Sequence, residues 1–168
     1  MMLSEPVSFK EKFLTYLPVF YVYAFSLLIS LNIVFFYSLN LRSLFLFFLG
    51  FFSISFGVLK LINLKSYFES VLEYDFIVQK FNFYAYLIPI FEIVFGALFV
   101  LQKEYLFIEY LCIIFFTLNI VVIANALEKK RNFTCACMGG LFKIPLSYVS
   151  LLESLTMVLG TIYLIYKM

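Results

Sequence analysis

The stretch Phe13–Leu41, FLTYLPVFYVYAFSLLISLNIVFFYSLNL, contains no charged residue and decides the class of protein. An α-helix rises about 1.5 Å per residue, so ~20 apolar residues cross the ~30 Å hydrocarbon core of a bilayer. Inside lipid, backbone N–H and C=O groups must be bonded within their own segment, which a helix allows. The stretch therefore predicts a membrane-spanning helix over Pro18–Ser38.

The remaining sequence has the same apolar character. Of the 168 residues, 65% are hydrophobic and 13% are charged, whereas soluble domains average roughly 45–50% and 25%. A core of this size cannot hide so much apolar surface from water, so we expect the excess to face lipid. Four further runs carry at most one charge each. They predict an all-α integral membrane protein whose later spans are Ser43–Leu59, Phe81–Gln102, Tyr110–Leu127 and Ile144–Tyr166. The fourth span is expected to open near Tyr105.

Composition also excludes several classes of function. A net charge of +2 is too small to indicate nucleic-acid binding, and we expect none. The absence of His removes the commonest metal ligand and the commonest general base near neutral pH. Three Cys are too few for a scaffold held together by disulfides.

Two connecting segments are longer than the tight turns between the other predicted helices. In the first, residues 60–80, apolar residues recur at helical spacing and predict an interfacial helix; they are Phe68, Val71, Leu72, Phe76 and Ile77. Asp75, within this segment, is expected to cap a helix or to be a solvated residue of the loop. The second, residues 128–145, contains basic residues, two Cys and two Gly. We call this second segment the cysteine loop.

The distribution of Lys and Arg predicts how the chain crosses the membrane. With five spans, nine of the twelve lie in the amino-terminal tail, the second loop and the cysteine loop, all on one side. Basic residues are enriched in cytoplasmic loops. The amino terminus and the cysteine loop are therefore predicted to be cytoplasmic, and the carboxyl terminus to lie outside.

The sharpest local motif is Cys135-Ala-Cys137, which places two thiols one residue apart. Such a pair can close a strained, easily reduced disulfide. It can also bind a soft ion such as Cu(I) as thiolates, with Met138 as a further ligand. The basic run Lys129–Arg131 favours the thiolate form in both cases. Cys135 and Cys137 are thus predicted to be redox-active or, alternatively, metal ligands, whereas Cys112, inside the fourth span, is expected to serve packing.

Four polar residues lie within the predicted spans or at their ends. Glu92 lies near mid-membrane, where an ionisable side chain costs roughly 2.5–3.5 kcal/mol on insertion scales and needs a partner. Lys60 follows the second span, Glu153 lies inside the fifth, and Asn125 lies near the same end of the fourth. We predict that Lys60, Asn125, Glu153 and the two cysteines converge at one membrane face with Glu92 deeper, and that Lys60 pairs with one of the two Glu.

Four motifs, in this order, give the chain a resemblance to a known family. They are Gly57–Leu64 (GVLKLINL), Tyr74-Asp75, Pro89–Gly96 (PIFEIVFG) and Cys135–Glu153 (CACMGGLFKIPLSYVSLLE). Over residues 43–166 the chain resembles the MauE/DoxX family of small bacterial membrane proteins, in particular its CxC-containing branch. The resemblance implies a cytoplasmic tail and an extra first helix in residues 1–42, and a four-helix core in residues 43–168 that includes the cysteine loop and lies in the bacterial inner membrane. It also implies that the two cysteines are a redox or metal pair and that Lys60, Glu92 and Glu153 are core polar residues.

The resemblance also implies a function. MauE is implicated in the maturation of a disulfide-rich enzyme subunit for methylamine oxidation, so we expect thiol–disulfide redox work or assistance in maturing a partner protein. Two alternatives stay open: a soft-metal binding or transport protein, and a non-catalytic accessory subunit of a larger membrane complex. These hypotheses leave three alternatives for the cofactor: no cofactor, Cu(I) or a quinone. The expected partners are the lipid bilayer and a protein partner or a larger membrane complex.

Overall fold

A computed structural model describes the backbone of residues 9–103, 105–128 and 148–167, and the side chains of these ranges from Leu17 onward except that of Tyr148. The described chain forms seven helices and contains no strand. They are α1 (Phe9–Tyr37), α2 (Leu41–Ile62), α3 (Leu64–Tyr74), α4 (Phe76–Lys80), α5 (Phe83–Val100), α6 (Leu106–Glu128) and α7 (Tyr148–Tyr166). All except α3 and α4 are long and apolar enough to cross a membrane, which makes five candidate spans. The prediction of an all-α, multi-pass membrane protein is confirmed.

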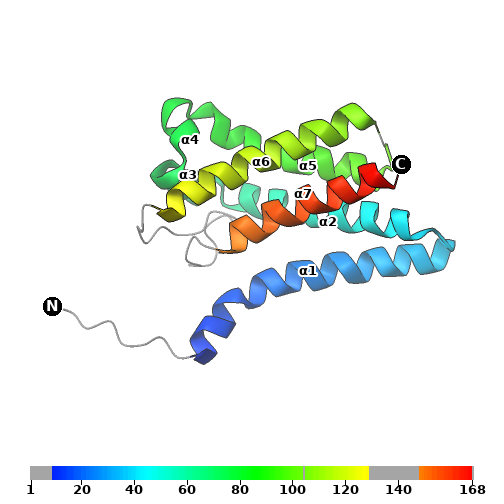
Figure 1. Ribbon diagram of the computed structural model, residues 1–168. Helices are drawn as coiled ribbons and strands as arrows, with labels where there is room; N and C mark the ends of the chain where they lie inside the picture. The colour runs from blue at the N-terminus through cyan, green and yellow to red at the C-terminus, as the bar shows by residue number, and fades with distance from the viewer. Residues whose placement is uncertain (1–8, 104, 129–147, 168) are drawn as a thin grey trace.

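The five long helices lie side by side, and α3 and α4 cover one end of them (Figure 1). Within this bundle α2 packs most extensively against α5, α6 against α7, and α1 against α2. We call the end that α3 and α4 cover the capped end. There α2 and α6 end and α5 and α7 begin, whereas the carboxyl terminus lies at the opposite end (Figure 1).

Helix α2 is longer than predicted because a charged side chain near its end is buried inside the bundle. It continues past the predicted end at Leu59 and includes Lys60, which is 5% exposed. Helix α6 begins at Leu106, close to the expected opening near Tyr105, and includes Glu109, which is 1% exposed. A rule that stops a span at the nearest charge therefore misplaces the end of α2.

The segment predicted as one interfacial helix forms two helices, because Asp75 interrupts it. The backbone of Asp75 is extended, and its Oδ1 accepts hydrogen bonds from the backbone N–H groups of Ile77 at 2.7 Å and Val78 at 3.1 Å. These bonds cap α4 at its amino end. Tyr67 and Val71 of α3 are buried, as is Val78 of α4. Helices α3 and α4 therefore close one end of the core instead of lying free at the membrane surface.

Helices α2 and α5 approach closely at two glycines. A Cβ atom on Gly96 would lie 2.7 Å from the carbonyl oxygen of Gly50 and 2.9 Å from the backbone nitrogen of Ile54. These neighbours are backbone atoms, so no side-chain rotation relieves the clash. Small residues at such points let helix backbones pack closely within a membrane. This contact fixes the height of α5 beside α2.

Gly96→Ala is expected to destabilise the protein by about 1–3 kcal/mol, because the new methyl group overpacks a contact between two backbones. Gly160→Ala is the matched control: its Cβ would lie 2.6 Å from Leu49 Cδ2, a side-chain atom that can move. The measurement is the midpoint of thermal unfolding in detergent micelles. Equal losses in the two variants would contradict the proposed role of the α2–α5 contact.

Candidate functional site

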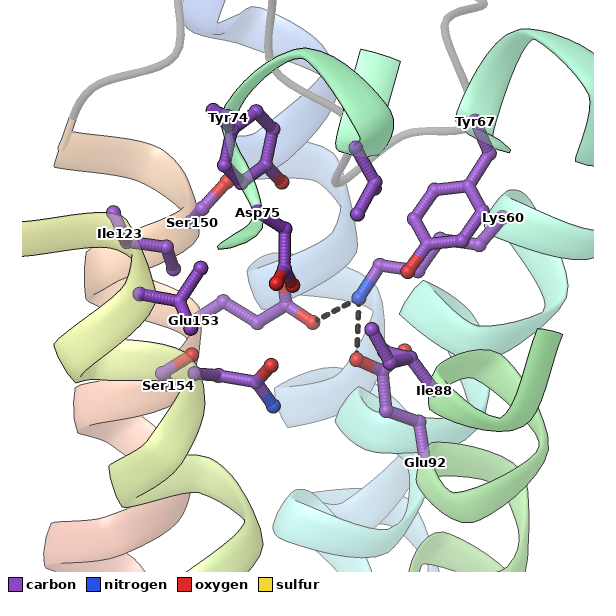
Figure 2. Close-up of a pocket in the computed structure, with 13 residues that line it drawn as sticks. Lys60, Tyr67, Tyr74, Asp75, Ile88, Glu92, Ile123, Ser150, Glu153 and Ser154 are labelled. Atoms are coloured by element: carbon purple, nitrogen blue, oxygen red, sulfur yellow. Dashed lines mark hydrogen bonds and ion pairs between the residues drawn. The ribbon is translucent and has the colours of Figure 1, made fainter. Parts of the chain in front are cut away.

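Lys60 lies in the last turn of α2 and points its amino group into the bundle between two carboxyl groups (Figure 2). Its Nζ forms an ion pair with Glu92 Oε1 of α5 and a second one, at 2.9 Å, with Glu153 Oε1 of α7. All three side chains are buried, with exposed fractions of 5%, 2% and 5%. We call these residues the Lys60 cluster. The cluster joins three membrane-spanning helices at a single nitrogen atom.

Local packing explains why these side chains meet. A Cβ atom on Gly57 would lie 2.9 Å from the carbonyl oxygen of Pro89, so α5 approaches α2 closely one helical turn before Lys60. Ser53, a further turn earlier, donates a hydrogen bond from its Oγ to the carbonyl oxygen of Glu92 at 2.7 Å. The register of α2 against α5 is therefore held by contacts in the two helical turns that precede Lys60.

The charges in the Lys60 cluster are unequal, since two carboxyl groups face one ammonium group. Buried charges are tolerated in a membrane only where they find partners, because each loses its hydration. The ring of Phe56, whose centroid is 6.0 Å from Lys60 Nζ, adds a weak favourable contact with the cation. The ion pairs are thus the main compensation for burying Lys60.

A cavity adjoins the Lys60 cluster at the capped end. The space open to the centres of water molecules is about 30 Å³, which leaves room for roughly one or two water molecules. Residues from α2, α3, α5, α6 and α7 line it, together with the residue between α3 and α4. They are Lys60, Tyr67, Val71, Tyr74, Asp75, Ile88, Glu92, Asn119, Val122, Ile123, Ser150, Glu153 and Ser154.

The α3–α4 region contributes one carboxyl group, from Asp75, and two phenol groups, from Tyr67 and Tyr74, to the wall of this cavity. Asp75 is 2% exposed, and its carboxyl group points toward that of Glu153 and the amino group of Lys60 (Figure 2). Burial raises the pKa of Asp75, although the hydrogen bonds from Val78 and Ile77 oppose that rise. Burial also raises the pKa values of Tyr67 and Tyr74 above the usual range, so both phenols stay protonated.

The structure brings together some of the residues predicted from sequence and not others. Lys60, Glu92 and Glu153 meet as expected, and Lys60 pairs with both carboxyl groups instead of one. Asn125 does not join them: it is exposed and donates its side-chain N–H to the carbonyl oxygen of Val121 at 3.0 Å. Asn119, almost two turns earlier on α6, lines the cavity in its place.

Of the three cysteines, only Cys112 lies among the described residues. Cys135, Cys137 and Met138 lie outside the described residues. Cys112 is fully buried, and its Sγ lies 3.7 Å from Thr161 Oγ1, which suits the packing role expected for it. Within the described ranges, no group of three or more His, Cys, Asp or Glu residues is placed to hold a metal ion.

Sequence reasoning missed Tyr67, Ser150 and Ser154 as residues of the cavity wall. A signal existed for Ser150, which lies three residues before Glu153 and therefore on the same face of α7. No such signal marks Tyr67, because its place depends on how α3 folds back over the bundle. Long-range packing alone brings its hydroxyl to the cavity (Figure 2).

Fold and site together define a class: a multi-pass α-helical membrane protein with a buried Lys–carboxylate cluster at one end of its bundle. Residues 31–167 match the family model described as Methylamine utilisation protein MauE. The match spans most of the chain, which therefore belongs to the MauE family. No curated protein and no solved structure matches the chain.

Lys60→Met is expected to destabilise the fold by roughly 3–5 kcal/mol, because it leaves two buried carboxyl groups without their cation. Lys65→Met is the matched control, since Lys65 is exposed on α3. Adding Glu92→Gln and Glu153→Gln to Lys60→Met should recover most of the loss, because the site then holds no charge. Thermal unfolding in micelles measures all three. A stable single variant, or a triple variant no better than the single one, would contradict the ion-pair account.

Asp75→Asn is expected to raise the thermal midpoint at neutral pH, because Asn keeps an oxygen for the helix cap but carries no charge. The sign follows from the pKa of Asp75, which burial raises in the folded state. The free energy of unfolding therefore falls as the pH rises from the unfolded pKa through the raised folded pKa, because the buried carboxyl group must then ionise. The gain should vanish in acid, below the unfolded value of about 3.9. Asp75→Ala, which loses the cap, should cost about 1 kcal/mol in acid as well. A gain from Asp75→Asn that is the same at every pH would refute this account.

Proposed function

We propose that this protein assists the maturation of a partner protein in the membrane by thiol–disulfide exchange through Cys135 and Cys137. One observation carries the proposal: the buried Lys60 cluster and its cavity lie at the capped end, where α6 ends and α7 begins. The chain between those two helix ends, residues 129–147, contains both cysteines. The segment with the thiol pair is therefore joined to the bundle at the end that holds this costly polar site.

Family membership supports a partner among the proteins of methylamine utilisation, which the family's description names. Enzyme subunits that need several disulfides require help in forming or correcting them. A small membrane protein with almost no soluble part has little surface for recognising a client. We therefore propose that a further membrane or soluble component brings the client to it.

The chemistry is a balanced exchange. A client thiolate attacks one sulfur of a Cys135–Cys137 disulfide, and a mixed disulfide forms as the other cysteine leaves as a thiolate. A second client thiolate then attacks the client sulfur of the mixed disulfide, and the remaining cysteine of the pair leaves as a thiolate. The client gains one disulfide, and Cys135 and Cys137 become two thiols. The basic run Lys129–Arg131, just before the pair, favours the thiolate form that leaves and attacks.

The side of the membrane decides which client is possible. The positive-inside pattern predicts that Cys135 and Cys137 face the cytoplasm, where thiols are kept reduced. A client outside the membrane requires the opposite face. Labelling of intact spheroplasts with a membrane-impermeant thiol reagent distinguishes the two, and Cys112 does not interfere because it is buried.

Mild oxidation is expected to protect Cys135 and Cys137 from alkylation, and reduction to restore two labelled thiols per chain, since a strained pair exchanges readily. The readout is the mass shift on alkylation. Cys137→Ser should trap a mixed disulfide with the partner, whereas Cys112→Ser, the control, should trap none. A pair that stays alkylatable at every redox poise contradicts the exchange function. Metal that co-purifies anaerobically and is lost in the double Cys→Ser variant would favour soft-metal binding instead.

A further inference from the structure

The Lys60 cluster contains a carboxyl oxygen whose burial needs explaining. Glu92 is 2% exposed, and its Oε2 is buried and makes no hydrogen bond within the described part of the chain. Its other oxygen, Oε1, is already bonded to Lys60. An ionised carboxylate distributes its charge over both oxygens, so a buried oxygen without a donor is a poor place for that charge. A protonated carboxyl group can hold its proton on one oxygen while the other accepts from Lys60.

Among the described residues that line the cavity, the charged and titratable groups do not include a second cation. Lys60 lies there from α2, Tyr67 and Tyr74 from α3, Asp75 from the α3–α4 junction and Glu153 from α7, while α6 contributes the neutral Asn119. Lys60 is the one cation among the residues that line the cavity, and three carboxyl groups share that cavity with it. The local charge balances more closely when carboxyl groups there hold protons.

Glu92 and Glu153 are placed to share a proton directly. Their Oε1 atoms contact the same nitrogen of Lys60, and the two carboxyl groups are close enough for a side-chain hydrogen bond. Two ionised carboxylates at such a distance repel each other, whereas one proton between them turns the contact into a hydrogen bond. A proton also needs no volume, unlike a metal ion, for which the described residues offer no set of three ligands.

We propose that Glu92 and Glu153 share one exchangeable proton, which makes the Lys60 cluster a proton-binding site within the membrane, and that Asp75 passes this proton between the cluster and the capped end. In each transfer the Asp75 carboxyl group gives its proton to the carboxylate of the cluster and takes another from water outside. The reverse step releases the proton. No oxidant, reductant or other reactant is required.

Asp75 suits this transfer role by position. It is the residue between α3 and α4, the two helices that close the capped end, and its carboxyl group points into the cavity toward Glu153 (Figure 2). The cavity has room for roughly one or two water molecules, which can bridge carboxyl groups that do not touch. Burial raises the pKa of Asp75, so this group takes up a proton more readily than an exposed Asp.

This proton site does not depend on the cysteine pair. It rests on residues of α2, α5 and α7 and on Asp75, and it would stand if Cys135 and Cys137 carried out no exchange. If exchange does occur, its thiols take up and release protons, and a proton site at the same end of the bundle would then serve that chemistry.

Infrared spectroscopy of the purified full-length protein in lipid nanodiscs tests the proposal. At neutral pH we expect a carbonyl band of a protonated carboxyl group that shifts when H₂O is replaced by D₂O. Glu92→Gln should remove this band and Glu153→Gln should shift it, because each variant changes one side of the shared hydrogen bond. Glu69→Gln, at an exposed position on α3, is the matched control and should leave the band unchanged. Glu109→Gln controls for the buried carboxyl group on α6.

Asp75→Asn supplies a second, independent readout, because it keeps the helix cap and should fold even where the Glu92 variant does not. We expect the band to persist in Asp75→Asn, with its shift in D₂O slowed at least severalfold. A wild-type protein without the band, or a band untouched by Glu92→Gln, overturns the shared proton. An unchanged exchange rate in Asp75→Asn overturns the transfer role, and complete loss of the band there assigns it to Asp75 itself. A thermal midpoint that rises with Na⁺ at constant ionic strength, and does so only with Glu92 intact, would replace the proton by an alkali ion.

Discussion

The ammonium group of Lys60, held between Glu92 and Glu153, is the interaction on which the rest of the fold depends. Each of these charges would be strongly unfavourable alone in the interior of a membrane protein, so none can leave the others without cost. Because the three residues come from α2, α5 and α7, the cluster fixes both the rotation and the height of three helices at once. Apolar packing alone does this less well in lipid, since lipid tails offer helices nearly the same contacts as neighbouring helices do.

Close packing of α2 on α5 makes the ion pair with Glu92 possible. Gly50 and Gly57 of α2 meet the backbone of α5 at Gly96 and Pro89, and Ser53 bonds to the carbonyl oxygen of Glu92 between these points. A long side chain such as Lys can bridge several ångströms, yet a second carboxyl group from α7 must reach the same nitrogen. Both carboxyl groups reach Lys60 Nζ only when α5 lies near α2, so the close packing at the glycines and the ion pairs depend on each other. Helices α3 and α4 then exclude lipid from the cluster by burying Tyr67, Val71 and Val78 over it.

Sequence alone predicts the five spans, because the length of an apolar segment is a local property and the thickness of the bilayer sets the length required. It also predicts that Lys60 finds Glu92 or Glu153, because an intramembrane charge must be compensated. It does not predict which neighbours complete the site. Asn125 and Asn119 are six residues apart on α6, and which of them faces the cavity depends on the rotation of α6 against α7, a property of many contacts. Asp75 is expected from the sequence to cap a helix or to lie in a solvated loop, and its side-chain bonds to Ile77 and Val78 show that it is a cap. The sequence does not show that it divides the segment into two helices, because the apolar spacing of residues 60–80 continues through it.

The two ends of the bundle differ in a way that bears on function. Polar groups at the capped end surround a cavity, whereas the opposite end has a tight turn between α1 and α2 and a short connection after α5. A protein that served only as an apolar scaffold would gain little net stability from burying Lys60 and two carboxyl groups, since apolar residues of similar volume are often at least as stabilising. Stability alone therefore does not account for the cluster. A buried carboxyl oxygen without a donor among the described residues, beside three carboxyl groups that share a cavity with Lys60, favours proton binding as the explanation, whether or not the cysteine segment carries out exchange.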